Sequence, residues 1–447
     1  MEQIQTLVIL GASGDLTSRL LLPGLATYLT GNPERRVQVV GSSREDHPDW
    51  AALVRDAFDE AGASGPAAEH AVETTRWVTA DATSGEDLAA LLAEVESPAC
   101  LYFALPPAIT QEAVAALAKM DLSDDLALAL EKPVGTDLET AREINRLVAR
   151  VVPEERTFRV DHFPGMPGVL SFIGLRFANR LLAPLWSSEH VESIAITFDE
   201  TLGLEGRASF YDSTGALRDM FQSHLLQVMA LVMMDPPSRF DPVEVPAGAA
   251  HVLRNTRLWG DDPARSVVRG RYTAGTVDGE ELPDYVAEEG VDPGNETETF
   301  FQVRLEVDSW RWGGVPVTLR SGKAIGSPRQ EIAITLKRPP HEYDALSTNL
   351  PPNTLTMGFE DEHLQVALNV GGPFDSRGRS RVTVSSSMPE AGLTAYGSVI
   401  RWILEGDPTF TVRGDAVEEG WRITEDVLAA WADQPLRDYP AGSSGPV

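Results

Sequence analysis

Residues 6–16, TLVILGASGDL, predict a strand, a glycine turn and the start of a helix. Thr6–Leu10 is a short apolar run rich in β-branched residues, which suits a strand buried in a parallel sheet. Gly11 and Gly14 follow, and apolar residues then recur at helical spacing over Leu16–Tyr28. This order places backbone N–H groups at a helix start, where a pyrophosphate can bind. The G-x-x-G spacing departs from the usual G-x-G-x-x-G, so a tight turn without a ligand is the alternative.

The second predicted strand, Val37–Val40, is followed by Ser42, Ser43 and Arg44. In NAD-specific domains an acid near this point binds the ribose 2′-hydroxyl. Here the first acid, Glu45, comes only after the two hydroxyls and the guanidinium. This arrangement favours the 2′-phosphate of NADP, although NAD remains an option and a solvated surface arginine is the alternative.

Two further buried strands, Cys100–Ala104 and Leu126–Leu130, alternate with helical stretches at Gln111–Met120 and Leu138–Val151. Strands that alternate with helices predict a doubly wound parallel sheet, and therefore an α/β Rossmann domain. We expect this NADP-binding domain to span residues 1–157.

Lys132 follows a predicted strand in the sequence Glu-Lys-Pro, at a strand end where such sheets bind ligands. Lysine is rare in this chain and arginine is plentiful, so a retained lysine suggests a need for its compact ammonium group. We predict that Lys132 reaches the cofactor or the substrate; a salt-bridged loop lysine is the alternative. Pro133 is expected to fix the turn, and a cis bond is one way to do so.

A second, α+β domain is predicted over residues 158–447. Its strands should form a large, mainly antiparallel sheet with one solvated or dimerising face. We expect residues 273–294 to form an acidic surface loop and residues 441–447 to be disordered. The predicted strands are Ile194–Phe198, Phe301–Val307, Val315–Leu319 and Ile332–Leu336.

One long amphipathic helix is predicted at Gly215–Met234, before two prolines. His224 falls on its apolar face, in a row of residues spaced by three and four. A lone histidine on such a face is usually a core residue with both nitrogens satisfied. A partly buried imidazole near a carboxylate is also what a general base requires at neutral pH.

Composition narrows the classes of function. A net charge of −30 disfavours binding to the phosphate backbone of nucleic acids. The first residues lack the features of a signal peptide, and no apolar run approaches the roughly 18 residues of a membrane helix. A single cysteine excludes an internal disulfide, and the scattered histidines predict no metal site. We therefore expect a cytoplasmic protein that acts on a small molecule.

Several segments, taken in order, resemble the glucose-6-phosphate dehydrogenase family between about residues 6 and 340. They are LGASGDLTSRLLLPGL, VVGSSR, ALPP, EKPVG, RVDHFPG, RFANR, ITFDETLGLEGR, GALRDMFQSHLLQ and VPVTLRSGKAI. The resemblance implies oxidation of the C1 hydroxyl of an aldohexose to the lactone, with hydride transfer to NADP, and a homodimer or homotetramer. It implies that His224 is the base and that Asp161 orients its imidazole.

The resemblance also implies two sets of binding residues. Those for the cofactor would be Gly11, Ser13, Gly14, Asp15, Leu16, Ser43, Arg44, Ala104, Pro106 and Lys132. Those for the substrate would be Lys132, His162, Phe163, Met166, Glu200, Asp219, His224 and Lys323.

The chain departs from the family pattern directly after the Asp-His pair. Where the family has Tyr and Lys, both serving the sugar phosphate, this chain has Phe163 and Met166. Loss of the lysine removes a charged contact of about 1.5–3 kcal/mol, or roughly 10–150-fold in affinity. Arg159, Arg320 or Arg329 could compensate. We therefore expect weakened phosphate recognition, with glucose 6-phosphate, free glucose, another aldose or a C6-modified sugar as substrate.

Two other functions fit parts of the sequence. Sugar oxidoreductases of the glucose–fructose oxidoreductase and inositol dehydrogenase type share the Glu-Lys-Pro turn, but they lack GASGDL and the ALRDM-x-x-x-H helix. A non-catalytic NADP-binding regulator would keep the nucleotide site alone, whereas Lys132, Asp161 and His224 are all present.

Overall fold

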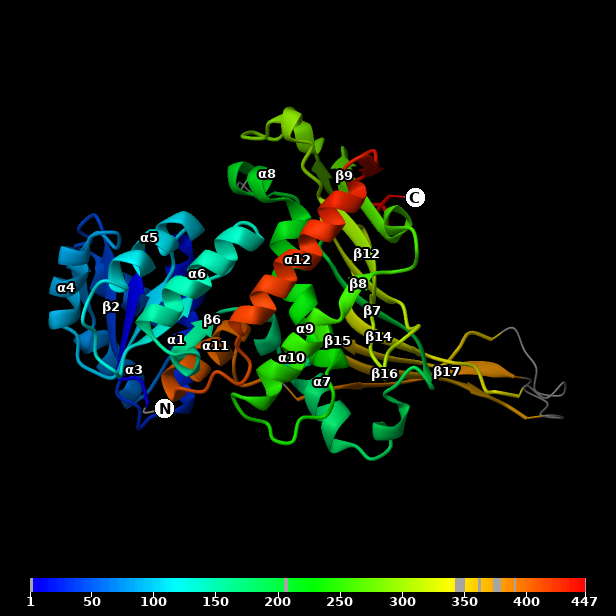
Figure 1. The fold of residues 1–447 in the computed structure, drawn as a ribbon, viewed down its shortest axis with the longest axis horizontal. Helices are drawn as coiled ribbons and strands as arrows, with labels where there is room; N and C mark the ends of the chain where they lie inside the picture. Colours follow the sequence, from blue (N-terminus) through cyan, green and yellow to red (C-terminus); the bar gives the residue numbers. More distant parts are fainter. Residues whose placement is uncertain are drawn as a thin grey trace. The chain divides into compact units, whose positions relative to one another are not determined.

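The computed structural model describes residues 3–204, 208–341, 350–360, 363–372, 379–389 and 391–446, without the side chains of Ser209 and Phe210. The chain forms two compact units, each assembled from separate segments (Figure 1). Unit 1 comprises Met1–Pro167, Met234–His251 and Glu390–Trp421. Unit 2 comprises Gly168–Met233, Val252–Pro389 and Arg422–Val447.

Unit 1 contains a six-stranded sheet in the order β3-β2-β1-β4-β5-β6, and every neighbouring pair is parallel. The predicted doubly wound sheet is therefore confirmed. The central strands β1, β4 and β5 are buried along their whole length, as expected where helices cover both faces. The strands are β1 Thr6–Leu10, β2 Gln38–Ser43, β3 Arg76–Thr79, β4 Ala99–Phe103, β5 Ala127–Leu130 and β6 Thr157–Arg159.

Helix α1 of unit 1 packs closely on α11, a helix from far along the sequence. A Cβ on Gly24 would lie 2.9 Å from the carbonyl carbon of Tyr396, so only glycine allows this approach. The helix predicted from Leu16 begins with a π-helical turn, η1. The helices are η1 Thr17–Leu21, α1 Leu22–Gly31, α2 Trp50–Glu60, α3 Pro66–Thr74, α4 Gly85–Ala93, α5 Pro107–Leu117, α6 Leu138–Val151, η2 Glu154–Arg156, η3 Phe163–Gly165 and α11 Ala395–Glu405.

Unit 2 is built on a ten-stranded sheet in the order β17-β16-β15-β14-β7-β13-β12-β9-β18, with β8 paired to β12. Most pairs are antiparallel, as predicted, whereas β7–β13 and β9–β18 are parallel. The strands are β7 Val191–Asp199, β8 Thr256–Leu258, β9 Val267–Thr273, β12 Phe300–Val307, β13 Val317–Gly322, β14 Gln330–Leu336, β15 Thr354–Gly358, β16 His363–Val370, β17 Ser380–Ser387 and β18 Arg437–Pro440.

The remaining helices lie in unit 2 or cross a boundary between the units. Three of them, α7, α10 and α12, contribute residues to both. None of the described helices is long and apolar enough to cross a membrane. The helices are α7 Pro167–Ala178, η4 Ala183–Leu185, α8 Ala208–Ala216, η5 Leu217–Leu225, α9 Leu226–Met233, α10 Glu244–Arg254, η6 Pro263–Ser266, η7 Tyr285–Ala287, η8 Pro293–Asn295 and α12 Gly414–Trp431.

The helix predicted over 215–234 is neither continuous nor amphipathic. Gly215, at φ +71°, interrupts α8 one residue before its end, and the π-helix η5 that follows passes into α9. All residues from 220 to 234 are buried. Other elements of unit 2 cover the last turn, where the side chains of Arg176, Trp186 and Trp312 donate to the carbonyls of residues 231, 232 and 233. These bonds satisfy carbonyls that a helix end leaves free.

Two further expectations are corrected. Within 273–294, β10 Gly275–Val277 and β11 Glu280–Leu282 form a hairpin, and Tyr285 is buried with its hydroxyl donated to Asp212 at 2.7 Å.

Residues 441–446 are ordered rather than disordered. The N–H of Gly442 donates to the carbonyl of Ala324 at 2.9 Å, and other backbone bonds follow. A Gly/Ser-rich composition does not indicate whether a segment makes such backbone hydrogen bonds.

Candidate functional site

A pocket of about 280 Å³ lies at the carboxyl ends of β1 and β2 in unit 1. Ligands of doubly wound sheets bind at this edge. Four of the predicted cofactor residues, Gly11, Ser13, Ser43 and Arg44, line it. The other lining residues are Leu10, Ser42, Glu45, Ala80, Asp81, Ala82, Leu105 and Ile109.

Gly11 lines this pocket in a tight turn. It has φ +82°, and a Cβ there would lie 2.4 Å from the carbonyl oxygen of Ala104 at the end of β4. The N–H groups of Gly11 and Ala12 donate to the carbonyl of Ser42 at 2.8 and 3.1 Å. The turn is thus bound to β2 and pressed against β4, which only glycine permits.

Polar groups in the pocket suit a phosphate-bearing nucleotide. The Ser42 hydroxyl is buried and has no hydrogen-bond partner among the described residues. The Arg44 side chain is exposed and bonds to no other described side chain. An orphaned hydroxyl and an available guanidinium beside a glycine turn fit the adenosine end of NADP.

The other predicted cofactor residues do not line this pocket. The N–H of Gly14 donates to the carbonyl of Gly11 at 3.1 Å, which closes the turn. Sequence reasoning missed Asp81, which follows the unpredicted strand β3 and has no motif around it. The predicted residues outside the lining are Gly14, Asp15, Leu16, Ala104, Pro106 and Lys132.

The Asp-His segment and its neighbours also belong to unit 1. Asp161 is buried, and its Oδ1 accepts a hydrogen bond from the N–H of Phe163 at 3.0 Å. The His162 ring stacks on Tyr396 of α11, with centroids 5.0 Å apart, and meets Phe163 edge-on at 5.2 Å. Phe163 and Met166 are both buried. The two residues that replace the family's Tyr and Lys are therefore part of the buried packing of unit 1, where Phe163 contacts the His162 ring.

Glu131, next to Lys132, has an unusual carboxyl environment. The hydroxyls of Tyr102 and Tyr396 both donate to it, the latter at 3.3 Å. Burial raises the pKa of Glu131 from 4.5 to about 7, although these hydrogen bonds and the Lys132 charge act in the opposite direction. The Lys132–Pro133 bond is cis, as the sequence suggested.

This raised pKa predicts a pH dependence of stability. Between pH 4.5 and about 7 the folded chain retains a proton on Glu131 that the unfolded chain releases, so stability falls as pH rises through this window. The loss is at most about 3 kcal/mol. We expect Glu131→Gln to remove this loss. In urea unfolding, the free energy of unfolding of the variant relative to that of the wild type should therefore be higher at pH 8 than at pH 5. A wild-type-to-variant difference that does not change with pH would contradict the raised pKa.

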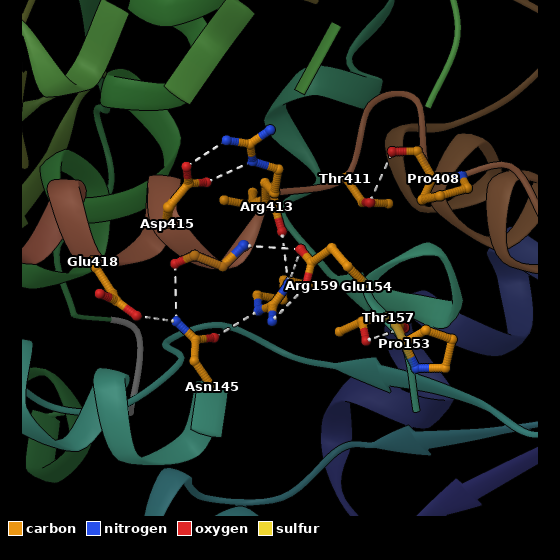
Figure 2. A network of polar contacts seen from close by, with 12 residues as sticks. Asn145, Pro153, Glu154, Thr157, Arg159, Pro408, Thr411, Arg413, Asp415 and Glu418 are labelled. Atoms are coloured by element: carbon orange, nitrogen blue, oxygen red, sulfur yellow. Dashed lines mark hydrogen bonds and ion pairs between the residues drawn. The ribbon is translucent and has the colours of Figure 1, made fainter. Parts of the chain in front are cut away.

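Arg159 is not available as a substitute phosphate ligand. Its guanidinium makes a bidentate ion pair with Glu154, at 2.6 and 3.1 Å, and its Nε donates to Asn145 at 3.0 Å (Figure 2). Arg320 is also engaged, since its Nε donates to both Asp199 oxygens at 3.0 and 3.2 Å. The Arg159 guanidinium is buried and already paired, and that of Arg320 is paired with Asp199; compensation by Arg320 or by Arg329, the third candidate, stays a prediction.

In unit 2, adjacent parallel strands bring two of the predicted sugar residues together. Asp199 at the end of β7 pairs with Gly322 at the end of β13, so the next residues, Glu200 and Lys323, leave the sheet side by side. Their side chains form an ion pair at 2.9 Å. The Lys323 ammonium also lies 5.3 Å from the ring centroid of Tyr211.

The π-helix η5 carries Asp219 and the buried His224. In a π-helix the backbone hydrogen bonds join residues five apart, so Asp219 and His224 lie about one turn apart along η5. The sequence prediction had assumed α-helical spacing for this segment. Burial raises the pKa of Tyr211, and the nearby carboxylates of Asp219, Glu298 and Glu200 raise it further. The Asp219 and Glu200 carboxylates thus both lie near Tyr211.

Both halves of the chain match family models of glucose-6-phosphate dehydrogenase. Residues 8–169 match its NAD binding domain and residues 173–447 its C-terminal domain. Glucose-6-phosphate 1-dehydrogenase of Gluconobacter oxydans is 37% identical over 98% of this chain and 94% of the relative.

Two solved structures have the same fold. A glucose-6-phosphate 1-dehydrogenase from Mycobacterium avium is 30% identical, with a TM-score of 0.86, covering 100% of this chain and 96% of that one. A glucose-6-phosphate dehydrogenase in complex with glucose-6-phosphate is 26% identical, with a TM-score of 0.87 and the same coverage. These matches confirm the predicted NADP-dependent sugar dehydrogenase and do not favour the alternatives. The chain belongs to the glucose-6-phosphate dehydrogenase family.

Proposed function

We propose that this chain oxidises the C1 hydroxyl of glucose 6-phosphate to the lactone and transfers the hydride to NADP. The observation that supports this most directly is the arrangement of four polar side chains in unit 2. Glu200 and Lys323 are joined at the ends of β7 and β13, and Asp219 and His224 lie about one turn apart on the π-helix η5. The full-length family match and a relative described with glucose 6-phosphate as its substrate favour this sugar.

The proposed roles follow the family resemblance. His224 removes the proton of the C1 hydroxyl, and Asp161 orients the imidazole and stabilises its charged form. Lys132, Glu200 and Asp219 hydrogen-bond sugar hydroxyls, which holds C1–H in position for transfer. The bound nicotinamide supplies the hydride acceptor. The phosphate end of the sugar is assigned to His162, Phe163, Met166 and Lys323.

Phosphate recognition is proposed to be weaker than in relatives that have Tyr and Lys at these positions. The double variant Phe163→Tyr/Met166→Lys should lower the KM for glucose 6-phosphate roughly tenfold or more, because it restores a hydroxyl and an ammonium. Free glucose lacks the phosphate that these two groups would bind, so the KM for glucose should change much less. Steady-state kinetics with both sugars, on protein with an unchanged melting temperature, make the test.

Two outcomes would contradict this proposal. One is an unaltered KM for glucose 6-phosphate in the double variant. The other is a wild-type KM for glucose 6-phosphate that is already low and a kcat/KM far above that for glucose, since phosphate recognition would then be intact without either group.

We also propose that residues 1–157 bind the nucleotide, that residues 158–447 bind the sugar and join the subunits, and that the protein is a cytoplasmic homodimer or homotetramer. The exposed apolar side chains at the β17 edge of the large sheet favour such an interface. They are Leu368, Val370, Val382 and Val384. The buried free thiol of Cys100 is compatible with a reducing compartment.

A further inference from the structure

The nucleotide pocket of unit 1 contains a fixed carboxylate that no sequence motif indicates. Asp81 lies two residues after β3 and lines the same pocket as Ser43 and Arg44. Its Oδ1 accepts hydrogen bonds from the N–H of Thr83 at 2.9 Å and from the Thr83 hydroxyl at 2.7 Å. The second oxygen, Oδ2, bonds to no group in the described part of the chain. The carboxylate is therefore held in place with one oxygen available to a ligand.

Asp81 is charged at neutral pH. The two hydrogen bonds from Thr83 lower the pKa of its carboxyl, and the Arg44 charge lowers it further. Arg44 and Asp81 are close enough to influence each other, yet they form no ion pair within 4.0 Å. The pocket thus presents one cation and one anion, neither of which neutralises the other by direct contact.

The two charges favour different nucleotides. A 2′-phosphate is attracted by Arg44 and repelled by Asp81, whereas a ribose 2′-hydroxyl can donate to a carboxylate. Rossmann domains that use NAD place such an acid after the second strand. Here an acid in the same pocket comes from the end of the third strand instead.

Glu45 is the other acid in the lining, but it is less suited to the task. Its side chain is exposed, and no hydrogen bond to its carboxylate holds it among the described residues. A carboxylate that is already fixed loses less entropy when it accepts a ligand hydroxyl. Asp81 is therefore the better acceptor.

We infer that Asp81 accepts the ribose 2′-hydroxyl of NAD, and that Asp81 and Arg44 together let this dehydrogenase use NAD as well as NADP. The inference concerns the nucleotide pocket alone and does not depend on which sugar is oxidised.

The test is the affinity of the full-length protein for NADH and NADPH, measured by nucleotide fluorescence without sugar. Asp81→Asn keeps the size of the side chain and one oxygen for Thr83. We expect NADH to bind roughly tenfold or more weakly, because a charged hydrogen bond is lost. NADPH should bind equally well or more tightly. Arg44→Ala should do the reverse, weakening NADPH and sparing NADH.

Asp87→Asn is the matched control. Asp87 Oδ2 accepts a hydrogen bond from the N–H of Asp81, but Asp87 does not line the pocket. This variant disturbs the same loop and should leave the NADH-to-NADPH affinity ratio unchanged. The inference is overturned if Asp81→Asn weakens both nucleotides equally, if the ratio does not move, or if the wild type binds no NADH. If the ratio shifts as expected but no sugar is oxidised, the proposed function fails and the inference stands.

Discussion

Replacing His224 by Asn should lower kcat by roughly 10²–10⁴-fold, the usual contribution of a positioned general base. Asparagine has nearly the size of the imidazole and can still hydrogen-bond, but it cannot accept a proton near neutral pH. His224 is buried within the π-helix η5, so a residue of similar size should limit the disturbance to the packing. The measurement is kcat with glucose 6-phosphate and NADP, together with a thermal melt.

A second histidine provides the control for this variant. His251 is an exposed residue of the helix α10, and His251→Asn should leave kcat unchanged. NADPH affinity should be the same in both variants and in the wild type, because neither residue lines the nucleotide pocket. A fall in kcat of less than tenfold for His224→Asn, with the fold intact, would show that another group removes the proton.

The π-helical form of η5 could not be predicted from the sequence. The spacing of apolar residues around His224 predicted an α-helix, in which each residue bonds to the fourth along. In η5 the backbone hydrogen bonds join residues five apart, so the turns are wider than in an α-helix. Nothing in the local composition distinguishes the two helix types. The segment, its glycine start and its histidine could be predicted, but the π-helical form of the turns that carry the histidine could not.

Local patterns were sufficient where strand, turn and helix follow each other directly. The stretch from Thr6 to Leu16 folds as predicted, because a buried strand and a glycine turn depend on neighbours in sequence. Asp81 was missed for the opposite reason. It shares a pocket with Gly11 only because β1, β2 and β3 stand side by side, and the strand before it, Arg76–Thr79, is short and partly polar.

Polar contacts between segments distant in the sequence could not be predicted either. Arg159 looked available for a phosphate because it lies just before the Asp-His pair. Its partners are Glu154 and Asn145, and its Nη1 also approaches the carbonyl of Val412, a residue 253 positions away. The N–H of Gly414 donates to the same Glu154 at 3.0 Å. A sequence shows the charge of an arginine, but it does not show which groups of the folded chain that arginine pairs with.

Replacing Arg159 by Met should lower the stability of unit 1 by about 3 kcal/mol. Removal of one partner from an ion pair whose two charges are both buried costs about 3–5 kcal/mol, because the remaining buried charge is left without compensation. The Arg159 side chain is 3% exposed, but that of Glu154 is 46% exposed. Water can therefore partly solvate the remaining carboxylate, and the cost falls to the lower end of this range. The measurements are the urea midpoint and amide hydrogen exchange of residues 408–418, which the network in Figure 2 joins to residues 145–159.

Arg413→Met is the matched control for this prediction, since it removes an arginine from the same network. Arg413 pairs with Asp415, and both side chains are about one-third exposed, at 32% and 37%. Exposed pairs contribute about 0–1 kcal/mol, so this variant should unfold almost as the wild type does. The Arg159 variant should in addition lose exchange protection at Gly414, whose N–H donates to Glu154. Equal effects of the two replacements would mean that Arg159 contributes only as an ordinary surface charge, and that the contact between these distant segments depends on apolar packing.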